Sequence, residues 1–318
     1  MQALRFAFLK RRACRPVQIL TYHRVNDDRD PFFPGTPTKT FSAQMGYLAD
    51  RCHVYSLTEA AQRLASNDVP ENAVVVTFDD GYRDNYTRAF PILKERGVPV
   101  TVFLATGVIG NGQVLWHDRV FSAFRETRQP ALSEYHPDVP FHTLCTLEDK
   151  LVAQHAVLRV LRLMNEEDRS RWIARLAERL AVDERAQDSE LMLNWEHVME
   201  MRRAGVSFGS HTVSHPILSR LSREQMRVQI VDSCADIARH LGERPQVFAY
   251  PNGGKDDFNE VTKDLLQEAG YICAVTTIFG ANSHGQDPFE LRRGQPWEEH
   301  LPTFAIKLSW YRFVSTSA

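Results

Sequence analysis

Residues 73–81 read AVVVTFDDG, an apolar run that ends in two adjacent aspartates, Asp79 and Asp80, followed by Gly81. A continuous apolar run is typical of a strand buried on both faces of a parallel sheet, because a half-exposed strand would alternate apolar and polar residues. Two carboxylates at the end of such a strand repel each other, and a bound cation would offset the repulsion. Capping of a following helix is the alternative explanation of the pair.

Further apolar runs of the same kind occur along the chain, and helical stretches follow them. This alternation of strand and helix predicts an α/β architecture. Ser56 is expected to cap one helix at its N-terminus, and Gly97 and Gly242 are expected to end two others. The further strand candidates are VQILTY (17–22), PVTVFLA (99–105), VSFG (206–209), QVFAY (246–250) and YICAV (271–275).

A long, charged and helical pattern occupies residues 115–203. It is too long for one crossover between strands, and no clear linkers flank it. We therefore expect one domain over residues 1–318, with residues 115–203 as a helical insertion within it. A scaffold is the favoured role of the insertion, and a mobile lid is the alternative.

Bulk properties exclude several classes of protein. A net charge of -2 and a pI near 6.6 give no overall field that would attract nucleic acid, so no nucleic-acid partner is expected. The cysteines are odd in number and lack CxxC spacing, which argues against a disulfide framework and a thiolate zinc site and predicts buried thiols. They are Cys14, Cys52, Cys145, Cys234 and Cys273.

The first residues, MQALRFAFLKRRACR (1–15), lack the order and length of a secretory signal. No segment reaches the ~18 apolar residues of a membrane span. A cytoplasmic location is therefore expected. The basic N-terminus leaves a weak peripheral membrane contact open, and a solvated tail is the alternative.

Two histidines follow a second strand in SFGSHTVSHP (207–216), where His211 and His215 lie four residues apart. This spacing brings two imidazoles onto one face, where their neutral nitrogens can share a metal ion. With one carboxylate added, they form a site with open positions for water and substrate. Catalytic zinc centres use such sites, and iron and other divalent ions accept them.

Two weaker stretches lie further along the chain. In VFAYPNGG (247–254), backbone N–H groups near Asn252 are candidates for binding an oxyanion, although an ordinary tight turn would look the same. In FELRRGQPW (289–297), Arg292 or Arg293 is a candidate to keep Asp79 ionised and oriented. A pair of surface arginines is the alternative.

The order of TFDDG, HTVSHP and the strand-exit turn resembles the polysaccharide deacetylase family, the NodB-homology carbohydrate esterases of family 4. LTYHRV and FAYPNGG are most similar to its poly-N-acetylglucosamine deacetylase branch, and the resemblance covers roughly residues 17–110 and 204–297. It implies a distorted, partly open (β/α) barrel of about seven strands. It also implies a metal-dependent hydrolase that removes acetyl groups from an N-acetylated saccharide.

The resemblance assigns roles to the motif residues. It makes Asp79 the general base and Asp80, His211 and His215 the ligands of a divalent metal, zinc in the first place, with cobalt, nickel, manganese or iron as alternatives. The family's arginine in the third motif is absent here, where Ala249 stands. We hypothesise that Arg292 or Arg293 replaces it.

The family's late histidine motif is not found cleanly, so the general acid must come from elsewhere. His23 and His284 are the candidates, and His23 is favoured because its strand would run into the mouth of the barrel. Three aromatic residues are candidates to contact sugar rings, with core packing as the alternative for each. They are Trp116, Tyr250 and Trp297.

Two other functions compete with deacetylation. The first is an amidohydrolase acting on a small non-sugar amide, because the broad family includes such enzymes. The second is a catalytically inactive carbohydrate-binding protein, suggested by the missing arginine at Ala249. Retention of Asp79 argues against the second, because metal binding alone does not require it.

Overall fold

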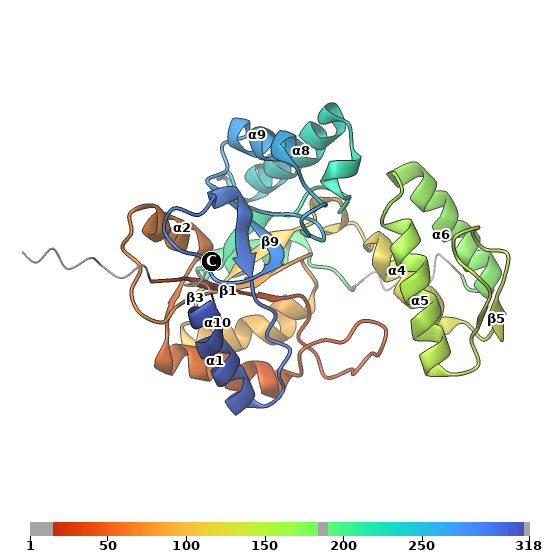
Figure 1. The fold of residues 1–318 in the computed structure, drawn as a ribbon, viewed down its shortest axis with the longest axis horizontal. Helices are drawn as coiled ribbons and strands as arrows, with labels where there is room; N and C mark the ends of the chain where they lie inside the picture. The colour runs from red at the N-terminus through yellow and green to blue at the C-terminus, as the bar shows by residue number, and fades with distance from the viewer. Residues whose placement is uncertain (1–14, 184–189, 315–318) are drawn as a thin grey trace, which may run out of the picture.

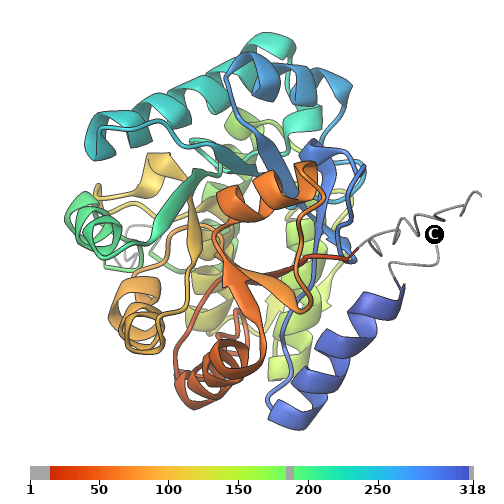
Figure 2. The same cartoon turned by 90° about the vertical axis from the view of Figure 1, so that its left-hand side faces the viewer.

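The computed structural model describes residues 15–183 and 190–314. Its main sheet is a nearly closed, parallel barrel surrounded by helices (Figures 1 and 2). The strands follow one another around the barrel in the order β1, β3, β4, β7, β8, β9 and β10. The strands of this sheet are β1 (Gln18–Tyr22), β2 (His53–Tyr55), β3 (Ala73–Phe78), β4 (Thr101–Leu104), β7 (Ser207–Ser210), β8 (Val247–Ala249), β9 (Cys273–Phe279) and β10 (Leu291–Arg293).

Closure of the barrel joins β10 to β1. The N–H of Thr21 donates to the carbonyl of Gly294 at 3.0 Å, and the N–H of Gly294 donates to the carbonyl of Ile19 at 2.8 Å. All strand pairs of this sheet are parallel. The predicted α/β barrel is therefore confirmed.

The buried strand that leads to Asp79 and Asp80, β3, lies among three others. It pairs with β1 along one edge, while β2 and then β4 share its other edge. All six of its residues are buried, as the apolar run predicted. The predicted strand list lacked β2 and β10, because each has only three residues and neither forms an apolar run.

Three of the barrel's outer helices begin or end at the predicted signals. The Ser56 hydroxyl accepts from the N–H of Glu59 at the start of α2, and Gly97 and Gly242 end α3 and α8 with φ of 62° and 74°. The outer helices of the barrel are α1 (Thr38–Arg51), α2 (Leu57–Ala65), α3 (Phe90–Arg96), α7 (Trp195–Arg203), α8 (Arg223–Leu241), α9 (Glu260–Glu268) and α10 (Leu301–Val314).

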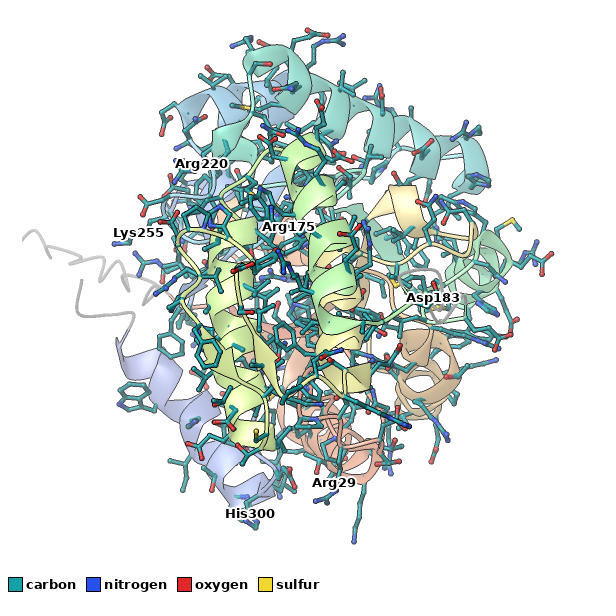
Figure 3. The ribbon with its side chains drawn as sticks, turned by 90° about the vertical axis from the view of Figure 1, so that its right-hand side faces the viewer. Arg29, Arg175, Asp183, Arg220, Lys255 and His300 are labelled. Atoms are coloured by element: carbon teal, nitrogen blue, oxygen red, sulfur yellow. The ribbon has the colours of Figure 1, made fainter. Side chains whose placement is uncertain are left out.

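The helical segment stands beside the barrel, on the right of Figure 1, and faces the viewer in Figure 3. It contains α4 (Trp116–Glu126), α5 (Leu147–Leu161), α6 (Glu166–Leu180) and a two-stranded hairpin of β5 (Ala131–Leu132) and β6 (His142–Thr143). Its apolar side chains pack into their own cluster, which includes Val120, Phe124, Val157 and Leu176. The single-domain assignment, with residues 115–203 inserted, stays a prediction.

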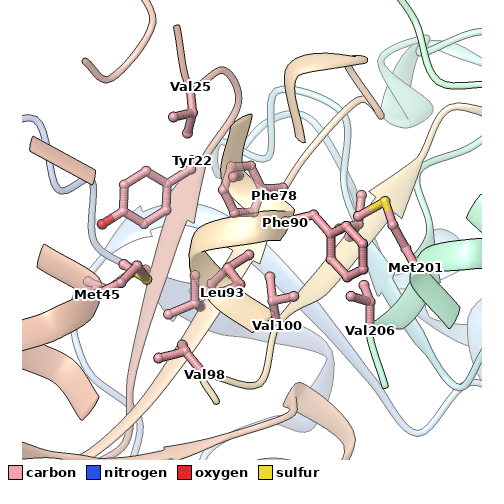
Figure 4. Packing of buried hydrophobic residues seen from close by; sticks show 14 of the residues in the cluster. Tyr22, Val25, Met45, Phe78, Phe90, Leu93, Val98, Val100, Met201 and Val206 are labelled. Atoms are coloured by element: carbon pink, nitrogen blue, oxygen red, sulfur yellow. The ribbon is translucent and has the colours of Figure 1, made fainter. Parts of the chain in front are cut away.

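A large apolar core holds β1 and β3 against the helices (Figure 4). The Tyr22 ring lies 5.2 Å from that of Phe41 and 5.4 Å from that of Phe78, between ring centres. Burying a side chain of this size contributes ~1.5–3 kcal/mol. Because Tyr22 and Phe78 are the last residues of their strands, this packing fixes the residues that follow them, His23 and Asp79.

Of the remaining sequence predictions, some fall on residues that the structure does not describe. The basic N-terminus, proposed as a membrane contact, lies in residues 1–14 apart from Arg15, and Cys14 lies there too. No helix within residues 15–183 and 190–314 has the length and apolarity to cross a membrane.

Cys234 and Cys273 are buried, as predicted, whereas Cys145 is exposed, so its predicted burial is wrong.

A candidate metal centre at the mouth of the barrel

The chain turns sharply where β3 ends. The N–H of Asp79 still bonds to the carbonyl of Tyr22 at 3.0 Å, and then Asp80 and Gly81 adopt positive φ of 74° and 88°. A Cβ on Gly81 would lie 2.9 Å from the Ile109 side chain and would be strained at this positive φ, so the position favours glycine. The turn directs the two neighbouring carboxylates to different partners.

Asp80 meets the two histidines of the second motif. Its Oδ1 lies 3.5 Å from Nε2 of His211 and 3.5 Å from Nε2 of His215. One ligand atom from each residue lies within 4.8 Å of the others, and all three side chains are buried. His215, like Asp80, has a positive φ, of 57°. Left-handed backbone at a non-glycine residue costs ~1–3 kcal/mol and tends to persist at functional sites.

The donor set fits a divalent cation. Asp80 Oδ1 is buried and makes no hydrogen bond within the described parts of the chain. His211 Nδ1 lies 2.7 Å from the carbonyl of Ala249, so Nδ1 carries the proton and the lone pair of Nε2 faces Asp80. A carboxylate without a partner beside two imidazole nitrogens is the ligand set that zinc and similar ions accept.

Electrostatics agree with this geometry. Burial raises the pKa of Asp80 well above its usual range, and the charge of Asp79 raises it further. Burial lowers the pKa of His211 to about 4 and places that of His215 well below its usual range. Both imidazoles are therefore neutral, as metal ligands must be, and a cation would relieve the carboxylate.

Asp79 turns the other way and pairs with Arg293 at the end of β10. Nη1 of Arg293 lies 2.8 Å from Oδ1 and Nη2 lies 2.7 Å from Oδ2, so the ion pair is bidentate. Both side chains are about 2% exposed. Burial alone would raise the pKa of Asp79, but the charge and hydrogen bonds of Arg293 outweigh it and lower the pKa to about 2. Asp79 is thus ionised at neutral pH.

Arg292, the other candidate, points elsewhere. It is exposed, and its backbone N–H bonds to Oδ1 of Asn282. Arg293 is fixed further by Nε, which donates to the carbonyl of Thr276 at 2.7 Å. Of the two arginines, only Arg293 contacts Asp79 in the described structure.

The two candidate acids, His23 and His284, lie in different parts of the structure. Nε2 of His23 lies 4.0 Å from Oδ2 of Asp79, and its side chain is 35% exposed, so His23 stands at the opening of the site. His284 instead bonds through Nδ1 to the carbonyl of Leu64 near the end of α2, away from the carboxyl ends of the strands. The structure therefore does not bring His284 to Asp79.

The remaining candidates fall into different environments. Tyr250 is fully buried, stacks on Phe258 with 4.2 Å between ring centres and donates its hydroxyl to the carbonyl of Phe289, so its predicted contact with sugar is wrong. Trp297 is 74% exposed in the loop after β10. Trp116 is half-buried, and its indole N–H donates to the carbonyl of His215 at 3.3 Å, so it borders the candidate metal centre.

In the turn at Asn252, the backbone N–H groups differ in whether they make a hydrogen bond. The N–H of Gly253 bonds to the carbonyl of Pro251, and that of Gly254 bonds to Oδ2 of Asp257. The N–H of Asn252 makes no hydrogen bond within the described residues, and Asn252 has a positive φ of 59°. It is therefore a candidate donor to a ligand.

Sequence reasoning missed further residues at this centre, and all but one come from the helical segment. The ring of His117 lies 5.1 Å from that of His215, and its Nε2 lies 3.1 Å from the Tyr82 hydroxyl, which donates to Asp118 at 2.9 Å. The guanidinium of Arg169, on α6, lies 4.9 Å from the centre of the Trp116 ring. The segment is thus more than a distant scaffold, because it forms one wall of the site.

These additional groups also have shifted pKa values. Burial lowers the pKa of His117 to about 3, with smaller contributions from neighbouring charges that include Arg169. Burial raises the pKa of Asp118 to about 7, although its hydrogen bond from Tyr82 opposes the shift. A signal in the sequence was available in WHD (116–118), a histidine and an aspartate in the first turn of a helix.

Comparisons with known proteins give a consistent result. A family model described as polysaccharide deacetylase matches residues 66–138 and 142–274, and so runs through the helical segment that the motif resemblance left out. The chain is 25% identical over 290 residues to "Putative polysaccharide deacetylase YxkH" of Bacillus subtilis (strain 168), covering 90% of this chain and 74% of that protein. Over 80 residues, 24% of this chain and 12% of that protein, it is 35% identical to the poly-beta-1,6-N-acetyl-D-glucosamine N-deacetylase of Escherichia coli (strain K12).

Solved structures share the fold. The Streptococcus pyogenes deacetylase PplD, in complex with acetate, has a TM-score of 0.62 at 20% identity, covering 92% of this chain and 97% of that one. IcaB from Ammonifex degensii has a TM-score of 0.61 at 20% identity, covering 94% and 97%. At this identity the likeness establishes the fold alone.

Proposed function

The chain belongs to the polysaccharide deacetylase family, and on that premise we propose that it is a metal-dependent hydrolase that removes the acetyl group from an N-acetylated amino sugar in a saccharide. The family resemblance read from the motifs is confirmed by the family model. One observation carries the proposal: Asp79, held by Arg293, lies beside the buried group of Asp80, His211 and His215. A base and a metal site are thus adjacent.

The ligands proposed for the metal are Asp80, His211 and His215. Zinc is the first choice because it accepts two imidazoles and one carboxylate with positions left open, and cobalt, nickel, manganese and iron are alternatives. When bound, such an ion supplies Lewis-acid polarisation of a carbonyl oxygen and lowers the pKa of water.

Asp79 is proposed as the base. Its pKa of about 2 keeps it ionised, so it can accept a proton from water as the water oxygen forms a bond to the acetyl carbonyl carbon. Arg293 holds both carboxylate oxygens and so orients them. The free N–H of Asn252 is proposed to donate to the carbonyl oxygen as negative charge develops there.

His23 is proposed as the acid. The carbon–nitrogen bond breaks as the sugar nitrogen takes a proton from His23, giving acetate and a free amino sugar. The partial exposure of His23 and its 4.0 Å distance from Asp79 support this role, because a proton donor must be within reach of the substrate amide. Trp116, at the edge of the site, is proposed to pack against a sugar ring.

An inactive binding protein is a poorer explanation. That alternative came from the missing arginine at Ala249, but Arg293 supplies a guanidinium to Asp79 from another strand. The backbone carbonyl of Ala249 has a separate task, because it orients His211. Metal binding alone gives no reason to maintain a buried ion pair at Asp79.

Acetate release from N-acetylglucosamine oligomers tests the proposal. The purified protein is treated with a chelator, and zinc, cobalt, nickel, manganese or iron is then added back. We expect release that stops on chelation, returns with metal and is absent in Asp79→Asn. If the protein binds metal but releases no acetate from any N-acetylated sugar, the amidohydrolase alternative replaces the proposal.

A further inference from the structure

An arginine of the helical segment reaches the wall of the metal centre. The first turn of α6 lies against the loop that carries His215, because the Ser214 hydroxyl donates to Oε2 of Glu166 at 2.9 Å. One turn further along, the Arg169 guanidinium lies over Trp116, whose indole N–H bonds to the backbone of His215. Arg169 thus stands one aromatic ring away from the candidate metal ligands.

The Arg169 side chain is buried without a counterion. The residue is 2% exposed, and its guanidinium makes no hydrogen bond and no ion pair with any residue that the structure describes. Other buried cations are paired: Arg293 holds Asp79, and Lys263 lies within 3.0 Å of three carboxylates. Stacking on an indole offsets only part of the cost of burying a charge.

The nitrogens of Arg169 account for the little of the residue that is exposed. None of them is among the buried polar atoms that lack a partner, so the small exposure of the residue belongs to its guanidinium. Glu166, on the same helix, is an acid whose charge acts on Arg169, but it makes no ion pair with Arg169 and accepts from the Ser214 hydroxyl. A planar guanidinium in this position matches the two oxygens of a carboxylate or phosphate.

We propose that Arg169 binds an anionic group of the substrate, so that the preferred saccharide carries a carboxylate or phosphate near the N-acetyl group that is removed. This inference rests on the proposed deacetylase function and names the substrate class. The acetate product offers the same oxyanion chemistry from a second source, and the experiment separates the two.

Binding is measured by calorimetry on the full chain in the presence of a chelator, which stops turnover. The probes are an N-acetylglucosamine tetrasaccharide and a tetrasaccharide of the same length in which N-acetylglucosamine alternates with glucuronic acid. The acidic probe is expected to bind at least ~10-fold more tightly, since a charge-assisted pair is worth ~1.5–3 kcal/mol. Equal affinity of the wild-type protein for the two probes overturns the proposal without any variant.

Variants assign the preference to Arg169. Arg169→Met is expected to remove the preference, because it weakens binding of the acidic probe at least ~10-fold more than binding of the neutral probe, and Arg169→Lys is expected to keep part of the preference. Arg175→Met is the matched control, because Arg175 lies on the same helix and stacks on Trp172 at 5.0 Å but is exposed (Figure 3). A preference that survives Arg169→Met, or an equal loss for both probes, contradicts the proposal.

Sodium acetate is the third probe. If acetate binding depends on Arg169 while the two tetrasaccharides bind alike, the residue holds the product and the proposed substrate class is wrong. The deacetylase function is judged separately, by acetate release from the metal-loaded enzyme. Release without a charge preference refutes only the role of Arg169, whereas a charge preference without release refutes the deacetylase function.

Discussion

Arg293 donates hydrogen bonds to both carboxylate oxygens of Asp79, with N–O distances of 2.8 and 2.7 Å, although 214 positions separate the two residues in the chain. Asp79 follows β3 and Arg293 ends β10, and β1 lies between these strands in the barrel. The guanidinium therefore spans the barrel interior, where Nη1 also lies 3.3 Å from the Thr77 hydroxyl. The ion pair links closure of the barrel to the orientation of the proposed base.

Arg293→Met tests this link. It leaves a buried carboxylate without its partner, so we expect a loss of ~3–5 kcal/mol in the free energy of unfolding and a large loss of activity. Urea unfolding and acetate release measure the two effects. Arg292→Met is the control, since Arg292 is exposed, and it should change neither. Adding Asp79→Asn to Arg293→Met should restore part of the stability but no activity. If Arg292→Met and Arg293→Met both keep full activity, neither arginine is needed to orient Asp79 and the hypothesis is wrong.

Alanine variants of His23 and His284 show which of the two candidate histidines acts as the general acid. His23→Ala is expected to lower kcat by ~10²-fold, the usual effect of losing a positioned proton donor, with little change in KM. His284→Ala should leave kcat unchanged, because its imidazole bonds to Leu64 and not to the site. Steady-state acetate release measures both. If neither variant slows the reaction, no histidine of the pair is the acid.

Metal binding should stabilise the fold through Asp80. At a free zinc concentration of ~100 times Kd, linkage predicts ~2.7 kcal/mol of added stability and a higher Tm. Asp80→Asn should lose this response, and its metal-free form should be no less stable than the wild type, because burial and the charge of Asp79 disfavour the ionised carboxylate. Differential scanning calorimetry with and without zinc measures both effects. An undiminished rise in Tm for Asp80→Asn would place the metal elsewhere.

Asp118 should make stability depend on pH. Its pKa is about 7 in the folded protein, above the ordinary value of 3.8, so the folded state binds more protons between these values. The free energy of unfolding should therefore fall by ~2–4 kcal/mol from pH 4 to pH 7 through this group alone. Urea unfolding with chelator should show a smaller fall in Asp118→Asn. Asp50→Asn, at the surface, should follow the wild type, and an unchanged slope in Asp118→Asn would refute the assignment.

Local signals allowed much of this architecture to be predicted from sequence. The apolar run of β3 specified a buried strand, and the glycines after α3 and α8 supplied the left-handed conformations that end those helices. The proposed ligands could be found from local patterns: Asp80 lies two residues after the end of a strand, and His211 and His215 are four residues apart. Each of these features depends on neighbours in the chain.

Features that depend on distant parts of the chain could not be predicted in the same way. LRR in β10 looks like a surface pair of arginines, and only closure of the barrel buries Arg293 while Arg292 stays exposed. EEDRSRW at the start of α6 looks like a solvated helix face, yet Arg169 packs on Trp116 of another helix. The predicted sugar contact of Tyr250 is wrong for a similar reason, because the ring stacks on Phe258 in the buried core.

Trp297 and Tyr250 were predicted to act alike on sugar, and their environments now predict opposite phenotypes. Trp297 is 74% exposed, so Trp297→Ala should leave the free energy of unfolding unchanged, and any contact with sugar would appear as a KM for oligomers raised by ~3–10-fold. Tyr250→Phe should cost ~1 kcal/mol of stability, because the Phe289 carbonyl loses its donor, with kcat and KM unchanged. Acetate release from oligomers of two to five units, together with urea unfolding, measures both. An unchanged KM for Trp297→Ala at every length would exclude this residue from the binding surface, and a changed KM for Tyr250→Phe would mean that the turn it supports, at Asn252, also positions the substrate.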